Sequence, residues 1–176
     1  MRILYSLLSL ISLFFVSPSK AEVVESNEYG FKIVQNYEIN AKGKQIYNSI
    51  LAPKNWWSSS HTWSKNSNNL YIEPFANGCF CEKLENKGSV LHMNIVYIAP
   101  NKEIRMFGAL GPMQFSGSTG HLILKITEKD NSSNLEISFI GGGYFSGGLN
   151  KLAPMADKML SEQFSNLKNF IERDNK

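Results

Sequence analysis

The chain has 176 residues, of which 43% are hydrophobic and 19% charged, with a formal net charge of +3 and two cysteines. This composition is that of an ordinary globular protein, and it excludes a disordered tail, a collagen-like repeat and a disulfide-stapled miniprotein. A chain of this length buries enough surface to hold a core, and even a cavity, without a metal or a partner subunit. We therefore expect a monomer with no cofactor and no metal site.

The first 21 residues differ from the rest of the chain. Arg2 gives a short positive start, Ile3 to Val16 is an apolar run of 14 residues, and Ser19-Lys20-Ala21 supplies small residues. These are the three parts of a secretory signal peptide, and the apolar run is shorter than the roughly 20 residues that a permanent membrane helix needs. We therefore expect residues 1–21 to be cleaved after Ala21, with an uncleaved anchor as the alternative.

Removal of this segment changes the charge and the expected compartment. Arg2 and Lys20 go with it, which leaves 16 basic against 15 acidic residues and a net charge of +1. No lysine or arginine cluster remains to bind nucleic acid, and no stable membrane span is expected after cleavage. Residues 22–176 contain no linker or repeat, so they are predicted to form one domain, exported to the periplasm or secreted.

The first elements of the mature chain are a strand and a helix. Gly30 to Ile39 alternates between apolar and polar residues, which predicts a first strand. Ala41 to Leu51 changes to a helical period and is ended by Pro53. A second short helical turn is expected around Trp56 and Trp57.

Only strand and turn patterns occur between Leu70 and Ile140. Turn residues such as Asn77-Gly78 separate most runs of strand composition, as antiparallel hairpins require. The predicted strands are Leu70–Glu73, Cys79–Leu84, Val90–Ile98, Glu103–Phe107, His121–Glu128 and Leu135–Ile140.

A long amphipathic helix closes the chain. Apolar residues recur at intervals of three and four from Leu152 to Ile171 and form one continuous stripe. A sheet with one apolar face packs most economically against such a helix. We predict an α+β fold in which a curved antiparallel sheet of about six to seven strands wraps around the C-terminal helix, with two short helices after the first strand.

This order of elements and several short motifs resemble the START-like, helix-grip superfamily (SRPBCC), which includes polyketide cyclases and homologues of the activator of a heat-shock chaperone ATPase. The similarity spans about Tyr29 to Ile171 and is strongest to an exported bacterial branch. It implies a cavity between the concave sheet and the last helix, usually filled by an apolar ligand, but fold alone does not choose among carriers, enzymes and co-chaperones. The motifs are Trp56-Trp57, His61-Thr62-Trp63-Ser64, Gly78-Cys79-Phe80-Cys81-Glu82, Gly88-Ser89-Val90-Leu91-His92-Met93, Gly108-Ala109-Leu110-Gly111-Pro112-Met113-Gln114 and Gly142-Gly143-Tyr144.

Cys79 and Cys81 lie two residues apart on a predicted strand, so both side chains point to one face. Three interpretations are open. Buried free thiols are favoured, because parallel side chains on a regular strand are poorly placed for bonding. A strained or transient disulfide would suit an exported protein, and a metal site lacks further ligands at a usual spacing.

Glu82 and His92 form a second candidate constellation. If Asn86–Gly88 form a three-residue loop, Glu82 pairs with His92 and Cys81 with Met93, whereas a two-residue loop would change this pairing. The cysteines then share the cavity face with Leu91, Met93, Ile95 and Tyr97. A carboxylate beside an imidazole orients it for acid–base chemistry, although an exposed cross-strand ion pair on the solvent face is the favoured interpretation.

Aromatic and sulfur-containing side chains are expected to line the cavity, since aromatic walls and flexible methionines suit small-molecule pockets. Core packing explains the same residues, and the Gly-rich stretches 108–120 and 141–148 are either mobile lids or places of close backbone approach. The predicted ligand-binding residues are Trp56, Trp57, His61, Trp63, Cys79, Cys81, Met93, Ile95, Tyr97, Phe107, Leu110, Met113, Tyr144, Phe145, Met155 and Met159.

Two hypotheses on function follow from these patterns. The favoured one is a non-enzymatic carrier or sensor that holds a lipid-like or aromatic small molecule. The alternative is a cyclase- or hydrolase-like enzyme in the same cavity, with His61, Glu82 and His92 as candidate catalytic residues. Export disfavours a co-chaperone, because the chaperone and its ATP are not outside the cell.

Overall fold

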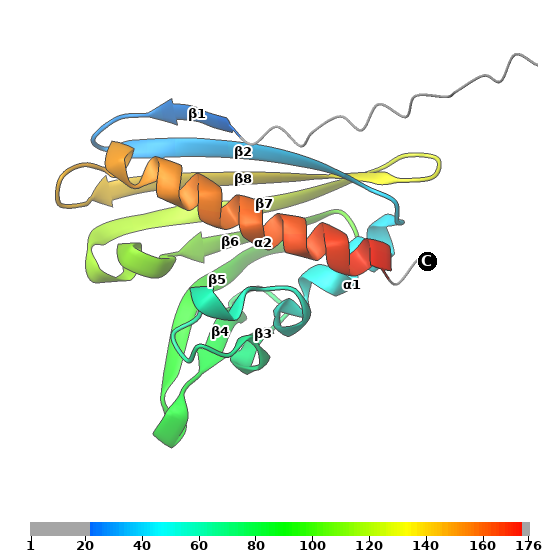
Figure 1. The fold of residues 1–176 in the computed structure, drawn as a ribbon, viewed down its shortest axis with the longest axis horizontal. Helices are drawn as coiled ribbons and strands as arrows, with labels where there is room; N and C mark the ends of the chain where they lie inside the picture. The colour runs from blue at the N-terminus through cyan, green and yellow to red at the C-terminus, as the bar shows by residue number, and fades with distance from the viewer. Residues whose placement is uncertain (1–21, 174–176) are drawn as a thin grey trace, which may run out of the picture.

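The structure, a computed structural model, describes residues 22–173 (Figure 1). The expected signal peptide, residues 1–21, lies outside the described residues. Among the described residues no helix is both long and apolar enough to span a membrane.

Residues 22–173 form eight strands and two α-helices, joined by turns and short 3-10 helices. In chain order they are β1 (Glu22–Ser26), β2 (Gly30–Ile39), α1 (Gly43–Ile50), β3 (Leu70–Ile72), β4 (Cys79–Lys83), β5 (Ser89–Ala99), β6 (Glu103–Gly108), β7 (Gly117–Glu128), β8 (Ser133–Tyr144) and α2 (Ala153–Arg173).

The strands form one antiparallel sheet in the order β1-β2-β8-β7-β6-β5-β4-β3. Helix α2 lies across one face of this sheet, and α1 sits near its C-terminal end (Figure 1). The predicted α+β fold is thereby confirmed, but the sheet has eight strands where six to seven were expected. The additional strand is β1, a five-residue edge strand before Gly30, so the predicted first strand is the second.

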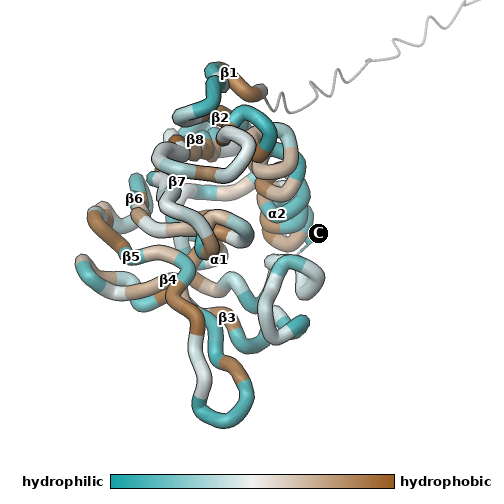
Figure 2. The backbone as a smooth tube through the Cα atoms, turned by 90° about the vertical axis from the view of Figure 1, so that its left-hand side faces the viewer, coloured by the Kyte–Doolittle hydropathy of each residue, from teal (hydrophilic) through white to brown (hydrophobic). Residues whose placement is uncertain are grey.

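Alternation along the strands and the stripe along α2 build the core. On β2, Phe31, Ile33, Tyr37 and Ile39 are buried, and every second residue of β7 and β8 follows the same pattern. Figure 2 views the layers from the end, with α2 beside the strands. The residues of α2 that face the sheet include Ala156, Leu160, Phe164, Leu167 and Ile171, all buried.

A buried polar contact fixes the position of α2 along β2. Gln35 is fully buried, and its Nε2 donates to Asp157 Oδ1 at 2.7 Å and to Ser161 Oγ at 2.9 Å. The hydroxyl of Tyr37 donates to Gln35 Oε1 at 3.1 Å. Because a buried amide is costly to leave unpaired, these bonds favour one register of the helix on the sheet.

The two Gly-rich stretches show close packing at the positions inside strands. A Cβ atom at Gly120 would lie 2.6 Å from the Phe139 ring, and one at Gly141 would lie 2.7 Å from the Phe31 ring. Glycine at these positions lets the two aromatic rings pack directly against the backbone of the sheet. This supports close approach as the role of Gly120 and Gly141.

Candidate functional site

A cavity of about 350 Å³ lies between the inner face of the sheet and the first half of α2. Residues 57–63 and 110–113 form its other walls. This volume is in the range of pockets that hold small molecules, about 300 to 1,000 Å³.

Eight of the predicted site residues line this cavity. They come from four separate parts of the chain, which the fold brings together around one space. They are Trp57, His61, Trp63, His92, Leu110, Met113, Met155 and Met159.

Seven further residues of the wall were not predicted. Leu152 and Ala156 belong to the apolar stripe of α2, and Phe139 belongs to the alternation of β8, so each carried a signal for the core but none for a cavity. The seven residues are Ser60, Thr62, Gly111, Pro112, Phe139, Leu152 and Ala156.

The other predicted ligand-binding residues lie elsewhere. Trp56, Met93 and Ile95 are buried in the core, where Trp56 packs on Phe164 with ring centroids 5.8 Å apart. Tyr97, Phe107 and Tyr144 are exposed, and Phe145 packs at the edge of the core. None of these residues lines the cavity.

The predicted pairing of β4 with β5 is wrong, and the correction moves the candidate site. Glu82 pairs with Val90, Cys81 with Leu91 and Phe80 with Met93, so His92 is an extra residue on β5. The loop is one residue earlier than predicted, because Leu84 N–H bonds to the Gly88 carbonyl. The earlier loop moves each pairing partner by two residues and keeps the faces, whereas the extra residue at His92 shifts the pairing by one and exchanges them, so that Met93 lies opposite Phe80.

The cysteines therefore face away from the cavity. Cys81 lies opposite Leu91, which is exposed on the outer face of the sheet. Cys79 and Cys81 form a disulfide with a Cα–Cα distance of 5.4 Å, inside the usual range for such bonds. The favoured prediction of free thiols is wrong, and so is the placement of both residues in the ligand site. Residues 22–173 hold no group of three His, Cys, Asp or Glu side chains suited to a metal ion.

Glu82 points to the inner face of the sheet, where it is hydrogen-bonded to three other residues. Its side chain is fully buried, although the sequence favoured the solvent face. The carboxylate accepts hydrogen bonds from Ser64 N at 2.5 Å, Trp63 N at 3.1 Å and His92 Nε2 at 3.1 Å. Burial raises the pKa of Glu82, but the bonds from Ser64, Trp63 and His92 outweigh it and hold the pKa below its usual value.

His92 stands between this carboxylate and the cavity. Its side chain is almost fully buried, lines the cavity, and packs on the Phe80 ring with centroids 5.0 Å apart. Burial lowers the pKa of His92, and the hydrogen bond and charge of Glu82 oppose this without reversing it. The pair is thus an ionised carboxylate beside a neutral imidazole at neutral pH.

These pKa directions predict that acid destabilises the fold in two stages. The unfolded chain protonates His92 near pH 6.5 but the native chain does so only at lower pH, so stability falls as pH drops below about 6.5. Glu82 adds a second loss below about pH 4.5, where the unfolded carboxyl begins to take up a proton before the native one.

Urea unfolding from pH 7.5 to pH 5, compared between the wild type and His92→Gln, tests the first stage. The glutamine side chain can donate an N–H to Glu82 but does not titrate. The free energy of unfolding of His92→Gln should therefore fall less over this pH range than that of the wild type. The two remaining histidines are the same in both chains and cancel in the difference. Parallel curves for the two proteins would show that His92 is not responsible.

Two further contacts hold the rim of the cavity. His61 Nε2 and Glu162 Oε2 lie 3.1 Å apart and join residues 57–63 to α2, an exposed pair that contributes little stability. On the other side, Trp63 Nε1 donates to Gln114 Oε1 at 3.1 Å, and its ring stands edge-on to Phe115 at 5.4 Å. His61 is therefore at the rim and does not contact Glu82.

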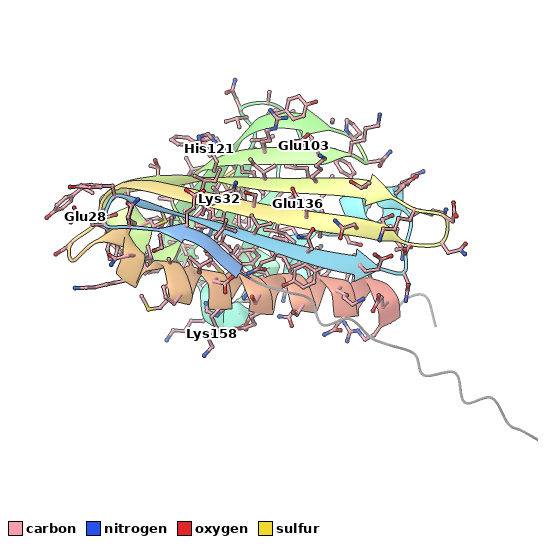
Figure 3. All side chains as sticks on the ribbon, turned by 90° about the horizontal axis from the view of Figure 1, so that it is seen from above. Glu28, Lys32, Glu103, His121, Glu136 and Lys158 are labelled. Carbon is pink, nitrogen blue, oxygen red and sulfur yellow. A yellow bond between two sulfur atoms is a disulfide. The ribbon has the colours of Figure 1, made fainter. Side chains whose placement is uncertain are left out.

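The third histidine is separate from the cavity. His121 is exposed on the face of the sheet away from α2, beside the Phe107 ring at 4.9 Å (Figure 3). The Glu82–His92 pair is consequently the only carboxylate–imidazole pair of the described residues that is buried at the cavity wall.

Similarity to known proteins is found at the level of structure. No sequence-defined family and no curated protein matches the chain. A conserved protein of unknown function, EF2215 from Enterococcus faecalis, aligns over 87% of this chain and 76% of its own, with 13% identity and a TM-score of 0.58.

Two other solved structures give the same result. CalU16 from Micromonospora echinospora aligns over 88% of this chain and 87% of its own, with 12% identity and a TM-score of 0.57. The Aha1 dimer from Colwellia psychrerythraea aligns over 80% of this chain and 96% of its own, with 14% identity and a TM-score of 0.55. Structural similarity at such low sequence identity shows a shared fold and does not show a shared activity. The chain has the α+β helix-grip fold that its sequence motifs implied, with an eight-stranded antiparallel sheet packed against a long C-terminal helix.

Proposed function

We propose that this protein is an exported carrier or sensor that holds one apolar small molecule, lipid-like or aromatic, in the cavity between the sheet and α2. The observation that carries the proposal is the cavity itself. Its wall is built mostly of apolar and aromatic side chains, with Trp57, Phe139 and Met159 from three different elements. Burial of apolar ligand surface against such a wall supplies the binding free energy.

Two features of the wall suit a binding protein. Methionines from the loop and from α2, Met113, Met155 and Met159, can adjust to apolar molecules of different shape. The rim is held by the exposed His61–Glu162 pair, which is weak enough to open when a ligand enters or leaves. Export of the protein to the periplasm or the medium rests on the pattern of residues 1–21, and the expectation of a monomer rests on the size of the domain.

An enzyme in the same cavity is the second candidate, and one observation favours it. His92 faces the cavity with Glu82 behind it, which is how an imidazole is oriented for proton transfer. A cyclase- or hydrolase-like reaction would use this pair as its base. The two candidates separate on one comparison, since His92→Gln should abolish turnover by an enzyme but leave a carrier able to bind.

Filling the cavity tests the proposed function directly. Ala156 lies on the wall and is nearly buried, so Ala156→Phe should occupy part of the space that the ligand needs. We expect wild-type protein to bind the neutral fluorescent probe N-phenyl-1-naphthylamine, and Ala156→Phe to weaken this binding about tenfold or more, or roughly 1.4 kcal/mol. Fluorescence titration measures both.

Lys158→Phe is the matched control for this experiment. Lys158 lies two residues further along α2 and points away from the sheet (Figure 3), so the same new side chain should leave probe binding unchanged. If Ala156→Phe binds the probe as well as the wild type does, the probe sits elsewhere and the cavity is not the binding site.

A further inference from the structure

We propose that the cavity selects a neutral, largely apolar molecule that carries a hydroxyl group, and that this hydroxyl donates a hydrogen bond to Nδ1 of His92. The inference rests on the proposed function, because it names the chemistry of the ligand for the same cavity. It follows from the protonation state of the Glu82–His92 pair, from the access to the ring, and from the other polar groups of the wall.

The protonation state follows from the bonds of Glu82. Its two carboxylate oxygens accept from Ser64 N, Trp63 N and His92 Nε2. An ionised carboxylate has no hydrogen to give, so the hydrogen in the bond to His92 belongs to Nε2. A neutral imidazole carries a single ring N–H. Nδ1 of His92 is therefore a bare lone pair, which accepts a hydrogen bond and cannot donate one.

The buried side-chain atoms that lack a hydrogen bond show that Nδ1 of His92 is accessible to a ligand. Among the described residues, Gln163 Nε2 is the one fully buried side-chain nitrogen or oxygen that lacks a hydrogen bond. Nδ1 of His92 has no partner in residues 22–173 either, so it is not sealed inside the protein. Since His92 lines the cavity, we take Nδ1 to be the acceptor that the ring offers to a ligand.

The other polar side chains of the wall are already engaged. Ser60 Oγ bonds with Ser58 Oγ at 2.8 Å, Thr62 Oγ1 donates to the Ser59 carbonyl at 2.8 Å, and His61 pairs with Glu162. All three lie on residues 57–63 near the rim. Ser60 and His61 are exposed and Thr62 is half-buried, so Nδ1 of His92 is the side-chain acceptor of the wall that belongs to a buried residue.

Charge selects a neutral donor. The fixed negative charge of Glu82 lies behind the imidazole and disfavours an anionic ligand, while burial disfavours the imidazolium that would attract one. A cationic ligand would lose its hydration against the apolar wall. A hydroxyl satisfies the lone pair without carrying charge, and the Glu82 carboxylate strengthens that bond by increasing the electron density of the ring.

A pair of probes that differ in one hydrogen-bond donor tests the proposal. At neutral pH 2-naphthol and 2-methoxynaphthalene are both uncharged, and only the first has a hydroxyl to donate. Wild-type protein should bind 2-naphthol about tenfold more tightly, the effect of one hydrogen bond to a buried acceptor. His92→Phe should lose this preference and still bind 2-methoxynaphthalene, whereas His121→Phe, which makes the same change outside the cavity, should keep it.

The outcomes separate this proposal from the proposed function. Equal affinity of the wild type for both probes, or a preference that survives in His92→Phe, overturns the hydroxyl contact and leaves the carrier intact. If neither naphthalene binds but N-phenyl-1-naphthylamine does, the hydroxyl contact is also wrong. If none of the three binds, the proposed function fails with it.

A second measurement needs no variant. In protein labelled with ¹⁵N at histidine, NMR should show His92 as the tautomer with its hydrogen on Nε2, and 2-naphthol should shift its Nδ1 resonance more than 2-methoxynaphthalene does. A hydrogen found on Nδ1, or equal shifts with both probes, would overturn the proposal even if His92→Phe did not fold.

Discussion

Glu82→Ala is expected to lower the free energy of unfolding by about 3–5 kcal/mol, the range found when one partner of a buried pair is removed. The substitution takes the acceptor away from three donors at once, namely Ser64 N, Trp63 N and His92 Nε2. Trp63 belongs to the segment that forms one wall of the cavity, and Ser64 directly follows it. Urea unfolding followed by circular dichroism measures the loss, and probe binding should weaken in the same variant.

Two matched substitutions show whether the effect comes from these bonds. Glu82→Gln keeps one acceptor oxygen but turns a donor toward another donor, so its loss should be intermediate. Glu85→Ala makes the same truncation three residues further on, where the side chain is exposed, and should change stability by less than about 0.5 kcal/mol. A similar loss at Glu82 and Glu85 would refute the anchoring role of Glu82.

Strands and helices were predictable because their signals are local. The alternation over Gly30 to Ile39 predicted β2 with its observed bounds, and the apolar stripe predicted α2 to within a few residues. Turn residues separated the strands of the meander. The short edge strand β1 was missed because Glu22–Ser26 has too few residues to show a period.

The candidate site was predictable only in part, because it depends on one hairpin. The extra residue at His92 exchanged the faces of Cys81 and Glu82 relative to Met93 and Ile95. Residue types in Cys79 to His92 do not determine this register, since both registers place apolar residues on one face. The sequence therefore identified Glu82 and His92 as a pair but placed them on the solvent side.

The sequence also could not predict which apolar residues line the cavity. Leu152, Ala156 and Phe139 follow the same periodicities as core residues, and the sequence pattern cannot tell a packed wall from an open one. The difference arises where the first half of α2 and the two loops fail to close on the sheet. That depends on the path of the whole chain and on no single motif.

The second large loss of stability is expected from a substitution in the second half of α2, where the helix is packed tightly against the sheet. Phe164 is 1% exposed, and its ring lies 5.8 Å from that of Trp56 and 6.4 Å from that of Tyr37. It therefore joins the helix to β2 and to the segment that leads into the cavity wall. We expect Phe164→Ala to lower the free energy of unfolding by about 3–5 kcal/mol, because the ring is lost and a void is left in the core.

Phe170→Ala is the matched control, because it makes the same change six residues further along α2. Phe170 is only partly buried at the edge of the core, so part of its surface already contacts water and its removal leaves no closed void. The loss there should be clearly smaller, since cavity formation adds to the transfer free energy only at a closed site. Urea unfolding of both variants measures the difference, and equal losses would mean that the helix is not held chiefly through Phe164.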